Sequence, residues 1–226
     1  MSETDGIVYI LDDEPEMVKA LTRLLRARRF EVLGFTAVRA FLEAYRPETN
    51  ACLVLDVAMP ELDGLELQQR LTHEAILIPI VFLTGHGNIP MSVRAIKAGA
   101  TDFLTKPVDA AVLAGAVRAA LKIGESQRRE AAEIKALKAR LASLTPRQHE
   151  VMERIVAGQL NKQVAFDLGT GEQNIKAHRA QVMRKMGVGS LAELVRIAER
   201  LGIGTQVAAA AARPRRESST QRTCRR

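Results

Sequence analysis

The chain has 226 residues, which is enough for one or two domains. Hydrophobic residues make up 47% and charged residues 26%, a balance that excludes a wholly disordered chain. The sequence has no apolar run long enough for a transmembrane helix, its N-terminus is acidic, and its two cysteines, Cys52 and Cys224, are too few for a disulfide framework. We therefore expect a cytoplasmic protein with no membrane partner.

The charge divides unevenly along the chain. Residues 1–122 carry 13 Lys and Arg against 16 Asp and Glu, a net −3. Residues 123–226 carry 20 against 10, a net +10. This asymmetry predicts two domains, and it makes the second half a candidate for binding a polyanion. A solvated basic surface with an arginine-rich tail is the alternative.

The front half alternates short apolar runs with stretches of helical spacing, such as 15–29 and 90–98. The runs are IVYIL (7–11), EVLGF (31–35), ACLVL (51–55), PIVFL (79–83) and TDFL (101–104). Alternating strands and helices predict a five-stranded, doubly wound parallel sheet of the α/β class, covered on both faces. We assign this domain to residues 1–122.

After Pro107 the pattern is helical over a long stretch, and we assign residues 123–143 as a helical linker in which Gly124 loosens the helix. Ile134, Leu137, Leu141 and Leu144 step by three, four and three, which is a short heptad seam. Either a solvated linker helix or a weak coiled-coil contact between two chains fits this pattern.

The back half predicts a small all-α domain over residues 144–205. Thr145 and Gln148 form a capping box for a helix over 146–157. Further helices are expected after an N-cap at Asn161 as far as Gly169, over 172–186, and after an N-cap at Ser190 as far as Gly202. The second and third have the form of a helix-turn-helix. Residues 206–226, with an alanine run and many arginines, are expected to be a disordered basic tail.

Polar side chains follow the predicted strands at the points where these end. Asp12 and Asp13 follow the first strand, and Asp56, Thr84 and Lys106 follow the third, fourth and fifth. The carboxyl ends of parallel strands share one edge, where ligands of such sheets bind. Clustered carboxylates repel and need a cation, and hard oxygen ligands suit Mg²⁺ or Mn²⁺. Asp56 could then be a nucleophile toward phosphorus, with Thr84 and Lys106 holding the phosphoryl oxygens.

Each of these residues also has a structural explanation. The aspartates could cap the following helices or open turns, Thr84 could cap, and Lys106 could be a surface residue. We favour function because all five fall at strand ends.

The front half resembles the receiver domain of two-component response regulators, particularly the FixJ group, over residues 5–122. The matching pieces are ILDDE (10–14), LDVAMPELDG (55–64) and LTGHGNIPMSVRAIKAGATDFLTKP (83–107). The resemblance implies a flavodoxin-like fold and a cis Lys106–Pro107 bond. It further implies these roles: Asp56 as phospho-acceptor, Asp13 and the Ala58 carbonyl as direct Mg²⁺ ligands, Asp12 as a ligand through water, Thr84 and Lys106 as phosphoryl-stabilising residues, and Thr84 with Phe103 as the switch.

The back half resembles a LuxR-type helix-turn-helix over residues 144–202. The matching pieces are LTPRQHEVMERIVAGQLNKQVAFDLG and NIKAHRAQVMRKMGVGSLAELVR. The resemblance implies that 172–186 is the recognition helix. The expected DNA-binding residues are Lys176, Ala177 and Ala180 in the major groove, with Asn161, Lys162, Arg184 and Lys185 on phosphates. The turn LGTGEQN and Ala180 depart from the family pattern, which leaves the operator sequence open.

We therefore expect a transcription factor that a sensor histidine kinase phosphorylates on an aspartate. Phosphorylation should promote a homodimer and sequence-specific binding to double-stranded promoter DNA, with RNA polymerase as a further candidate partner. A phospho-aspartate phosphohydrolase is the alternative from the enzyme class, although Ala58 stands where such enzymes carry a general acid. A protein-interaction module acting through the linker helix is another alternative.

Overall fold

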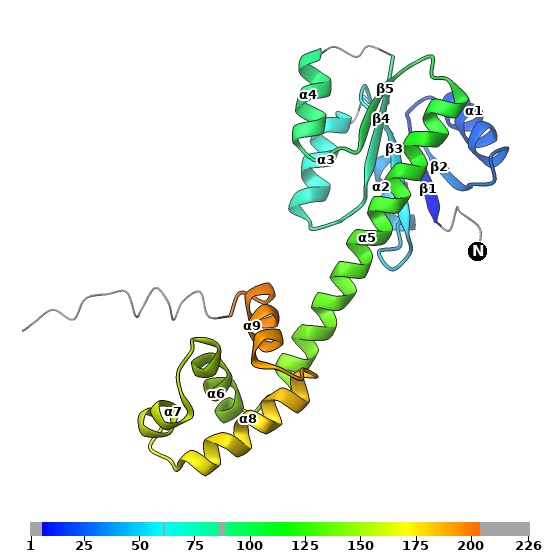
Figure 1. The fold of residues 1–226 in the computed structure, drawn as a ribbon. Coiled ribbons are helices and arrows are strands. Elements are labelled where there is room, and N and C mark those ends of the chain that lie inside the picture. Colours follow the sequence, from blue (N-terminus) through cyan, green and yellow to red (C-terminus); the bar gives the residue numbers. More distant parts are fainter. Residues whose placement is uncertain (1–5, 61, 86–88, 204–226) are drawn as a thin grey trace, which may run out of the picture. The chain divides into compact units, whose positions relative to one another are not determined.

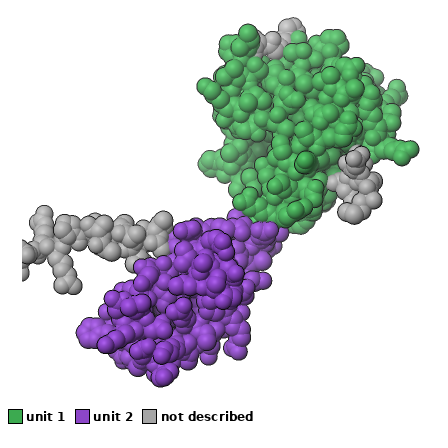
Figure 2. Space-filling view, viewed as in Figure 1, with its two compact units in different colours: residues 1–131 green, residues 132–226 purple. Residues whose placement is uncertain are grey.

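The computed structural model describes residues 6–60, 62–85 and 89–203. The chain divides into two compact units, residues 1–131 and 132–226 (Figure 2). The second unit therefore begins inside the segment assigned as the linker. The expected disordered tail over 206–226 lies outside the described residues. Within the part of the chain that the structure describes, no helix is both long and apolar enough to cross a membrane.

The first unit is an α/β sheet domain, as expected (Figure 1). Its elements are β1 (Ile7–Leu11), α1 (Pro15–Arg26), β2 (Glu31–Phe35), α2 (Val38–Ala44), β3 (Ala51–Asp56), α3 (Gly64–His73), β4 (Ile80–Thr84), α4 (Ile89–Lys97), β5 (Asp102–Thr105) and the start of α5 (Ala110–Ala142). The strands are all parallel, in the order β2-β1-β3-β4-β5. The doubly wound fold that the strand pattern predicts is thereby confirmed, and no strand boundary differs from the predicted one by more than one residue.

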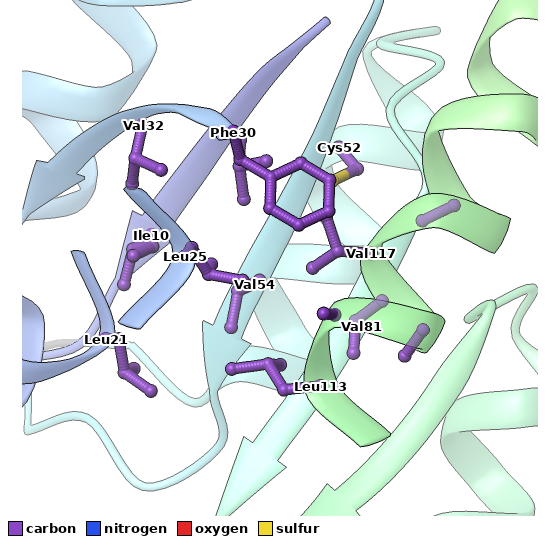
Figure 3. Close-up of a cluster of buried hydrophobic side chains, with 14 of the residues drawn as sticks. Ile10, Leu21, Leu25, Phe30, Val32, Cys52, Val54, Val81, Leu113 and Val117 are labelled. Atoms are coloured by element: carbon purple, nitrogen blue, oxygen red, sulfur yellow. The ribbon is translucent and has the colours of Figure 1, made fainter. Parts of the chain in front are cut away.

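The sheet is buried on both faces because its strands are almost wholly apolar. Alternate side chains point to opposite faces. Ile10, Cys52 and Val54 face α1 and α5, where they meet Leu25 and other apolar side chains (Figure 3). Val8 belongs to the same buried cluster. On the other face, Tyr9, Leu53 and Phe82 pack against α2, α3 and α4. Two hydrophobic layers therefore hold the strand ends in fixed positions.

Helix α5 is unbroken at Gly124, where we expected it to loosen. A Cβ at this position would lie 2.9 Å from the Ala51 carbonyl oxygen and 3.0 Å from the Asn50 side-chain oxygen. Glycine is therefore required for the close approach of the helix to the loop before β3, which outweighs its low helix propensity.

The second unit is helical. It contains the end of α5, then α6 (Pro146–Val156), α7 (Asn161–Asp167), α8 (Glu172–Met186) and α9 (Leu191–Arg200). Thr145 and Gln148 form the predicted capping box, Gly187 ends α8 with a φ of 70°, and the Ser190 hydroxyl caps α9. The predicted cap at Asn161 is wrong by one residue. Leu160 is the N-cap of α7, and its N–H donates to the Gln163 side chain at 2.8 Å.

The heptad seam is largely used inside the chain. Leu137 is buried, and Leu141 and Leu144 pack against the core of the helical unit. That core includes Val151, Ile155, Val164, Ile175, Val182 and Leu194. Because these leucines already have partners in their own chain, a coiled coil between two chains would have little apolar surface left on this part of α5.

Candidate functional site

The strand ends bring four of the predicted side chains to one edge of the sheet. Asp56 and Thr84 are the last residues of β3 and β4, and Asp12 and Lys106 directly follow β1 and β5. Strands β1, β3, β4 and β5 are consecutive neighbours, so these positions form a row. The residues Asp12, Asp56 and Thr84 are 2%, 6% and 1% exposed. Buried carboxylates of this kind need polar partners.

Lys106 is the shared partner of the two carboxylates. Its Nζ lies 2.6 Å from Asp12 Oδ2 and 2.9 Å from Asp56 Oδ1. The remaining oxygens accept from backbone groups: Asp12 Oδ1 from the Glu14 N–H at 3.0 Å, and Asp56 Oδ2 from the Ala58 N–H at 2.9 Å. The arrangement holds both oxygens of Asp56 in fixed directions.

The environment keeps Lys106 charged. Burial by itself would lower its pKa, but the hydrogen bonds to Asp12 and Asp56 and the charges of these two groups outweigh that cost and raise the pKa above its usual value. An ammonium that stays protonated at neutral pH is suited to bind anionic oxygens.

The loop after Asp56 is held by a close backbone contact at Gly64. The Gly64 N–H donates to the Val57 carbonyl at 2.9 Å, and Asp63 caps α3 by accepting from the Leu65 N–H at 2.8 Å. A Cβ at Gly64 would lie 2.4 Å from the Asp56 carbonyl oxygen. The role of Gly64 was not predicted from the sequence. The Asp-Gly pair at a helix start was the available signal, but it could not reveal the close approach.

The donor set at this edge fits a hard cation. Across residues 6–60, 62–85 and 89–203, no group of three or more His, Cys, Asp or Glu side chains is placed to hold a metal ion. Two carboxylates, Asp12 and Asp56, lie close enough to share the Lys106 ammonium, and the half-buried Asp13 is adjacent in sequence. Mg²⁺ is commonly bound by one or two carboxylates and keeps several waters, so the oxygen-only pair fits it.

Phe103 and Pro107 lie beside this edge. Phe103 is half-buried on β5 and packs against Phe82, with ring centroids 6.0 Å apart. The Lys106–Pro107 bond is cis, as the family resemblance implies. Thr84 is buried, and its carbonyl accepts from the Lys106 N–H at 2.8 Å.

The second candidate surface is the outer face of the helix-turn-helix formed by α7 and α8. Ile175, Val182 and Met186 anchor α8 in the core. The expected major-groove residues Lys176, Ala177 and Ala180 are exposed on α8, as are Arg184 on α8 and Lys162 on α7. Lys176 Nζ lies 3.3 Å from Glu172 Oε1, an exposed pair that DNA could displace.

Two of the expected phosphate contacts are engaged within the protein. Asn161 Oδ1 accepts from Arg179 Nη1 at 3.4 Å, which places the Arg179 guanidinium beside the start of α7. Arg179 was not among the predicted DNA-binding residues. Lys185 Nζ donates to the Ser143 carbonyl at 2.7 Å and to Gln148 Oε1 at 2.8 Å. Lys185 therefore points toward α6 and the end of α5.

Comparison with protein families matches both halves of the chain. Residues 8–118 match the response regulator receiver domain, and residues 142–198 match the bacterial regulatory proteins of the LuxR family. The two matches correspond to the sheet unit and the helical unit.

Relatives match the chain over both units together. It is 44% identical to the response regulator protein TodT of Pseudomonas putida over 201 residues, which cover 89% of this chain and 88% of that protein. It is 40% identical to the transcriptional regulatory protein FixJ of Bradyrhizobium diazoefficiens, covering 88% and 98%.

Solved structures also match the chain over both units. The response regulator StyR matches with a TM-score of 0.74 and 42% identity over 87% of this chain and all of that one. Full-length FixJ from B. japonicum matches with a TM-score of 0.53 and 40% identity over 88% of this chain and 98% of that one. The chain therefore belongs to the FixJ-type response regulators, transcription factors that join a receiver domain to a LuxR-type DNA-binding domain.

Proposed function

We propose that Asp56 is the phospho-acceptor of this response regulator and that a sensor histidine kinase is the donor. The observation that carries the proposal is the row formed by Asp12, Asp56 and Lys106, in which a buried carboxylate is oriented by an ammonium and a backbone N–H. A carboxylate held in this way is prepared to attack phosphorus without reorganising its surroundings.

The transfer balances with these groups. One oxygen of Asp56 attacks the phosphorus of a phosphohistidine, and the P–N bond breaks as the O–P bond forms. The electron pair leaves with the imidazole nitrogen, which takes a proton from solvent. Lys106 and the Ala58 N–H stand where they can donate to the phosphoryl oxygens, as does the Thr84 hydroxyl once it faces them.

The receiver family generally binds Mg²⁺ at the phosphorylation site, and we propose that this chain does so. Asp13, Asp56 and the Ala58 carbonyl would hold the ion directly and Asp12 through water. Bound there, the ion would neutralise charge that develops on the phosphoryl oxygens.

The test uses the full chain with a small acyl phosphate as donor. Intact-mass measurement should show one added phosphoryl group when Mg²⁺ is present and none when the metal is chelated. Asp56→Asn should take up none, and Asp63→Asn, an exposed helix cap, is the matched control that should label as the wild type does. Equal labelling of Asp56→Asn would remove Asp56 from this role.

We propose that the chain hydrolyses at most its own acyl phosphate. The residue two positions after the acceptor is Ala58, whose exposed methyl group cannot protonate a leaving group. This argues against a phosphohydrolase acting on external esters, and the absence of phosphate release from generic phosphoesters is the expected result.

Phosphorylation is proposed to favour a homodimer through α4 and β5. Ile89, Val93 and Ile96 form an exposed apolar stripe on α4, with exposed fractions of 80%, 44% and 47%. If Thr84 moves toward the phosphoryl group and Phe103 follows it, the population would shift toward the conformation in which this face can dimerise. Sedimentation with and without a phosphoryl mimic tests this, and a monomer unchanged at tens of micromolar would contradict it. The dimer would bind promoter DNA through α8, with RNA polymerase as a further candidate partner.

A further inference from the structure

A buried glutamine connects the recognition helix to the elements before it. Gln148, the third residue of α6, is 4% exposed. Its Oε1 accepts from the Thr145 N–H at 3.1 Å and from Lys185 Nζ at 2.8 Å, and its Nε2 donates to Gln181 Oε1. Because two donors meet the same atom, the oxygen of the amide must face them, and the NH₂ group must face Gln181.

A second connection lies one turn further along α8. Arg140, in the last turn of α5, donates from Nη1 to the Met186 carbonyl at 3.1 Å. Its guanidinium lies so close to Gly187 that a Cβ there would be 2.7 Å from Nη1. The last carbonyls of a helix lack partners within the helix and favour a cation. Lys185 adds a bond to the Ser143 carbonyl at 2.7 Å.

We propose that Arg140, Gln148 and Lys185 form a clasp that sets the orientation of α8 for DNA, and that Lys185 is a positioning residue and not a phosphate contact. The clasp ties the C-terminal turn of α8 to the end of α5 and the start of α6. The buried residues Ile175 and Val182 fix the depth of α8 in the core, but apolar packing is non-directional and tolerates small rotations. Directional hydrogen bonds from a charged group remove that freedom.

The exposed face that meets DNA depends on this rotation. Lys176, Ala177 and Ala180 lie on one side of α8, opposite the buried side. A small rotation of α8 about its axis would move all three relative to a base edge, and bidentate base contacts are lost when their geometry is displaced. Release of the clasp should therefore reduce specific binding more than nonspecific binding.

The proposal differs measurably from a phosphate contact at Lys185. Each phosphate that a lysine neutralises contributes about −0.9 to the slope of log K against log salt, so deletion of a phosphate contact makes the slope shallower by about that amount. A positioning residue leaves the slope unchanged. Replacing Lys185 and replacing Gln148 should lower the affinity for specific DNA by the same factor, because both substitutions break the same clasp.

The experiment uses the full chain and a duplex selected from random-sequence DNA by the wild-type protein. Lys185→Met keeps the aliphatic stem, and Gln148→Leu keeps the approximate size. Each should lower affinity for the selected duplex by about tenfold, the factor of one charge-assisted hydrogen bond. The double variant should bind within about twofold of the weaker single variant, and every salt slope should match the wild type. Arg184→Ala, on the adjacent exposed residue, is the matched control and should flatten the slope.

A further variant separates positioning from folding. Gln148→Glu keeps the acceptor for Lys185 and Thr145, while exposed Gln181 can turn its NH₂ group toward it, so affinity should return to within about twofold of the wild type. Helical circular dichroism at the assay temperature confirms that each variant is folded. The proposal is overturned if Lys185→Met flattens the salt slope by about 0.9, or if the affinity losses of Lys185→Met and Gln148→Leu multiply in the double variant. It is also overturned if either of these two single variants binds the selected duplex as tightly as the wild type.

Discussion

Gly64 lies against the end of β3, the strand that carries Asp56, so we expect the small substitution Gly64→Ala to lower both stability and phosphorylation strongly. The added Cβ would lie 2.4 Å from the Asp56 carbonyl oxygen, 3.1 Å from Val57 Cα and 3.2 Å from a ring carbon of Phe82. Two of these neighbours are backbone atoms in a sheet strand and its following loop. They cannot move without shifting the Asp56 side chain, so stability and phosphorylation should both suffer.

The magnitude follows from packing. Inserting a methyl group into a filled site costs about 1–3 kcal/mol, and rigid backbone neighbours place this site toward the upper part of that range. Alanine recovers up to about 1 kcal/mol as a better helix former at the first residue of α3. The net destabilisation should be about 2 kcal/mol, which lowers the Tm of a domain of this size by about 8 °C.

The chain supplies its own probe for this measurement. It has no tryptophan and two tyrosines, Tyr9 and Tyr45, and both lie in the receiver unit. Tyrosine near-UV circular dichroism during thermal unfolding therefore reports on the receiver alone. The rate of phosphoryl uptake from an acyl phosphate, measured by intact mass below the unfolding transition, should fall in the same variant.

Gly115→Ala is the matched control, because it is the same chemical change in α5 at a position where a Cβ would meet nothing within 4 Å. It should stabilise the receiver by about 0.5–1 kcal/mol and leave phosphorylation unchanged. If Gly64→Ala unfolds at the wild-type temperature and labels at the wild-type rate, the contact does not constrain the acceptor, and the reasoning is wrong.

Three further predictions concern charge. The pKa of Lys106 is raised in the folded state, so the stability that this residue contributes is present below its ordinary pKa of 10.5 and is lost as the pH rises through the raised value. Urea titrations should therefore show the free energy of unfolding of the wild type falling at strongly alkaline pH, and Lys106→Met should not show this loss. Lys176→Ala should weaken specific DNA binding by about 1–3 kcal/mol if it reads a base edge, whereas a uniform loss with a salt slope shallower by about one would make it a phosphate contact. Truncation after Gln206 removes six arginines and one glutamate over 213–226, and it should make the salt slope on random-sequence duplex shallower by about two to three units, whereas equal slopes would mean that the tail does not touch DNA.

The fold was predictable because its signals are local. Buried parallel strands read as short apolar runs, and a helix that caps itself, such as the one begun by Thr145 and Gln148, carries both halves of its capping box in the sequence. The row of Asp12, Asp56 and Lys106 was predictable for a different reason. Parallel strands place their carboxyl ends at one edge, so order along the chain becomes proximity in space.

Distances between elements were not predictable. Nothing in the sequence near Gly64 or Gly124 reveals that another backbone passes within van der Waals distance of it. Lys185 was expected to contact a phosphate because the resemblance to the LuxR-type helix-turn-helix implies it. In the structure its Nζ donates to Gln148, 37 residues earlier, whose side chain the sequence identified only as a helix cap. A capping residue that is also buried can bind a second side chain. Only its burial distinguishes such a residue from one that does no more than cap its helix.

The charge balance at the strand ends around Asp56 gives a physical reason to expect that phosphorylation there would act as a switch. Lys106 (+1) with Asp12, Asp13 and Asp56 (−1 each) gives a net −2, which the proposed Mg²⁺ would bring to zero. A phosphoryl group on Asp56 would replace one negative charge by about two, which takes the net charge to about −1. The Thr84 hydroxyl, once turned toward the phosphoryl oxygens, would donate a hydrogen bond to this added charge, and a hydrogen bond to a charged group contributes about 1.5–3 kcal/mol. The two states of a typical switch differ by a few kcal/mol, so we expect this interaction to shift the population between them.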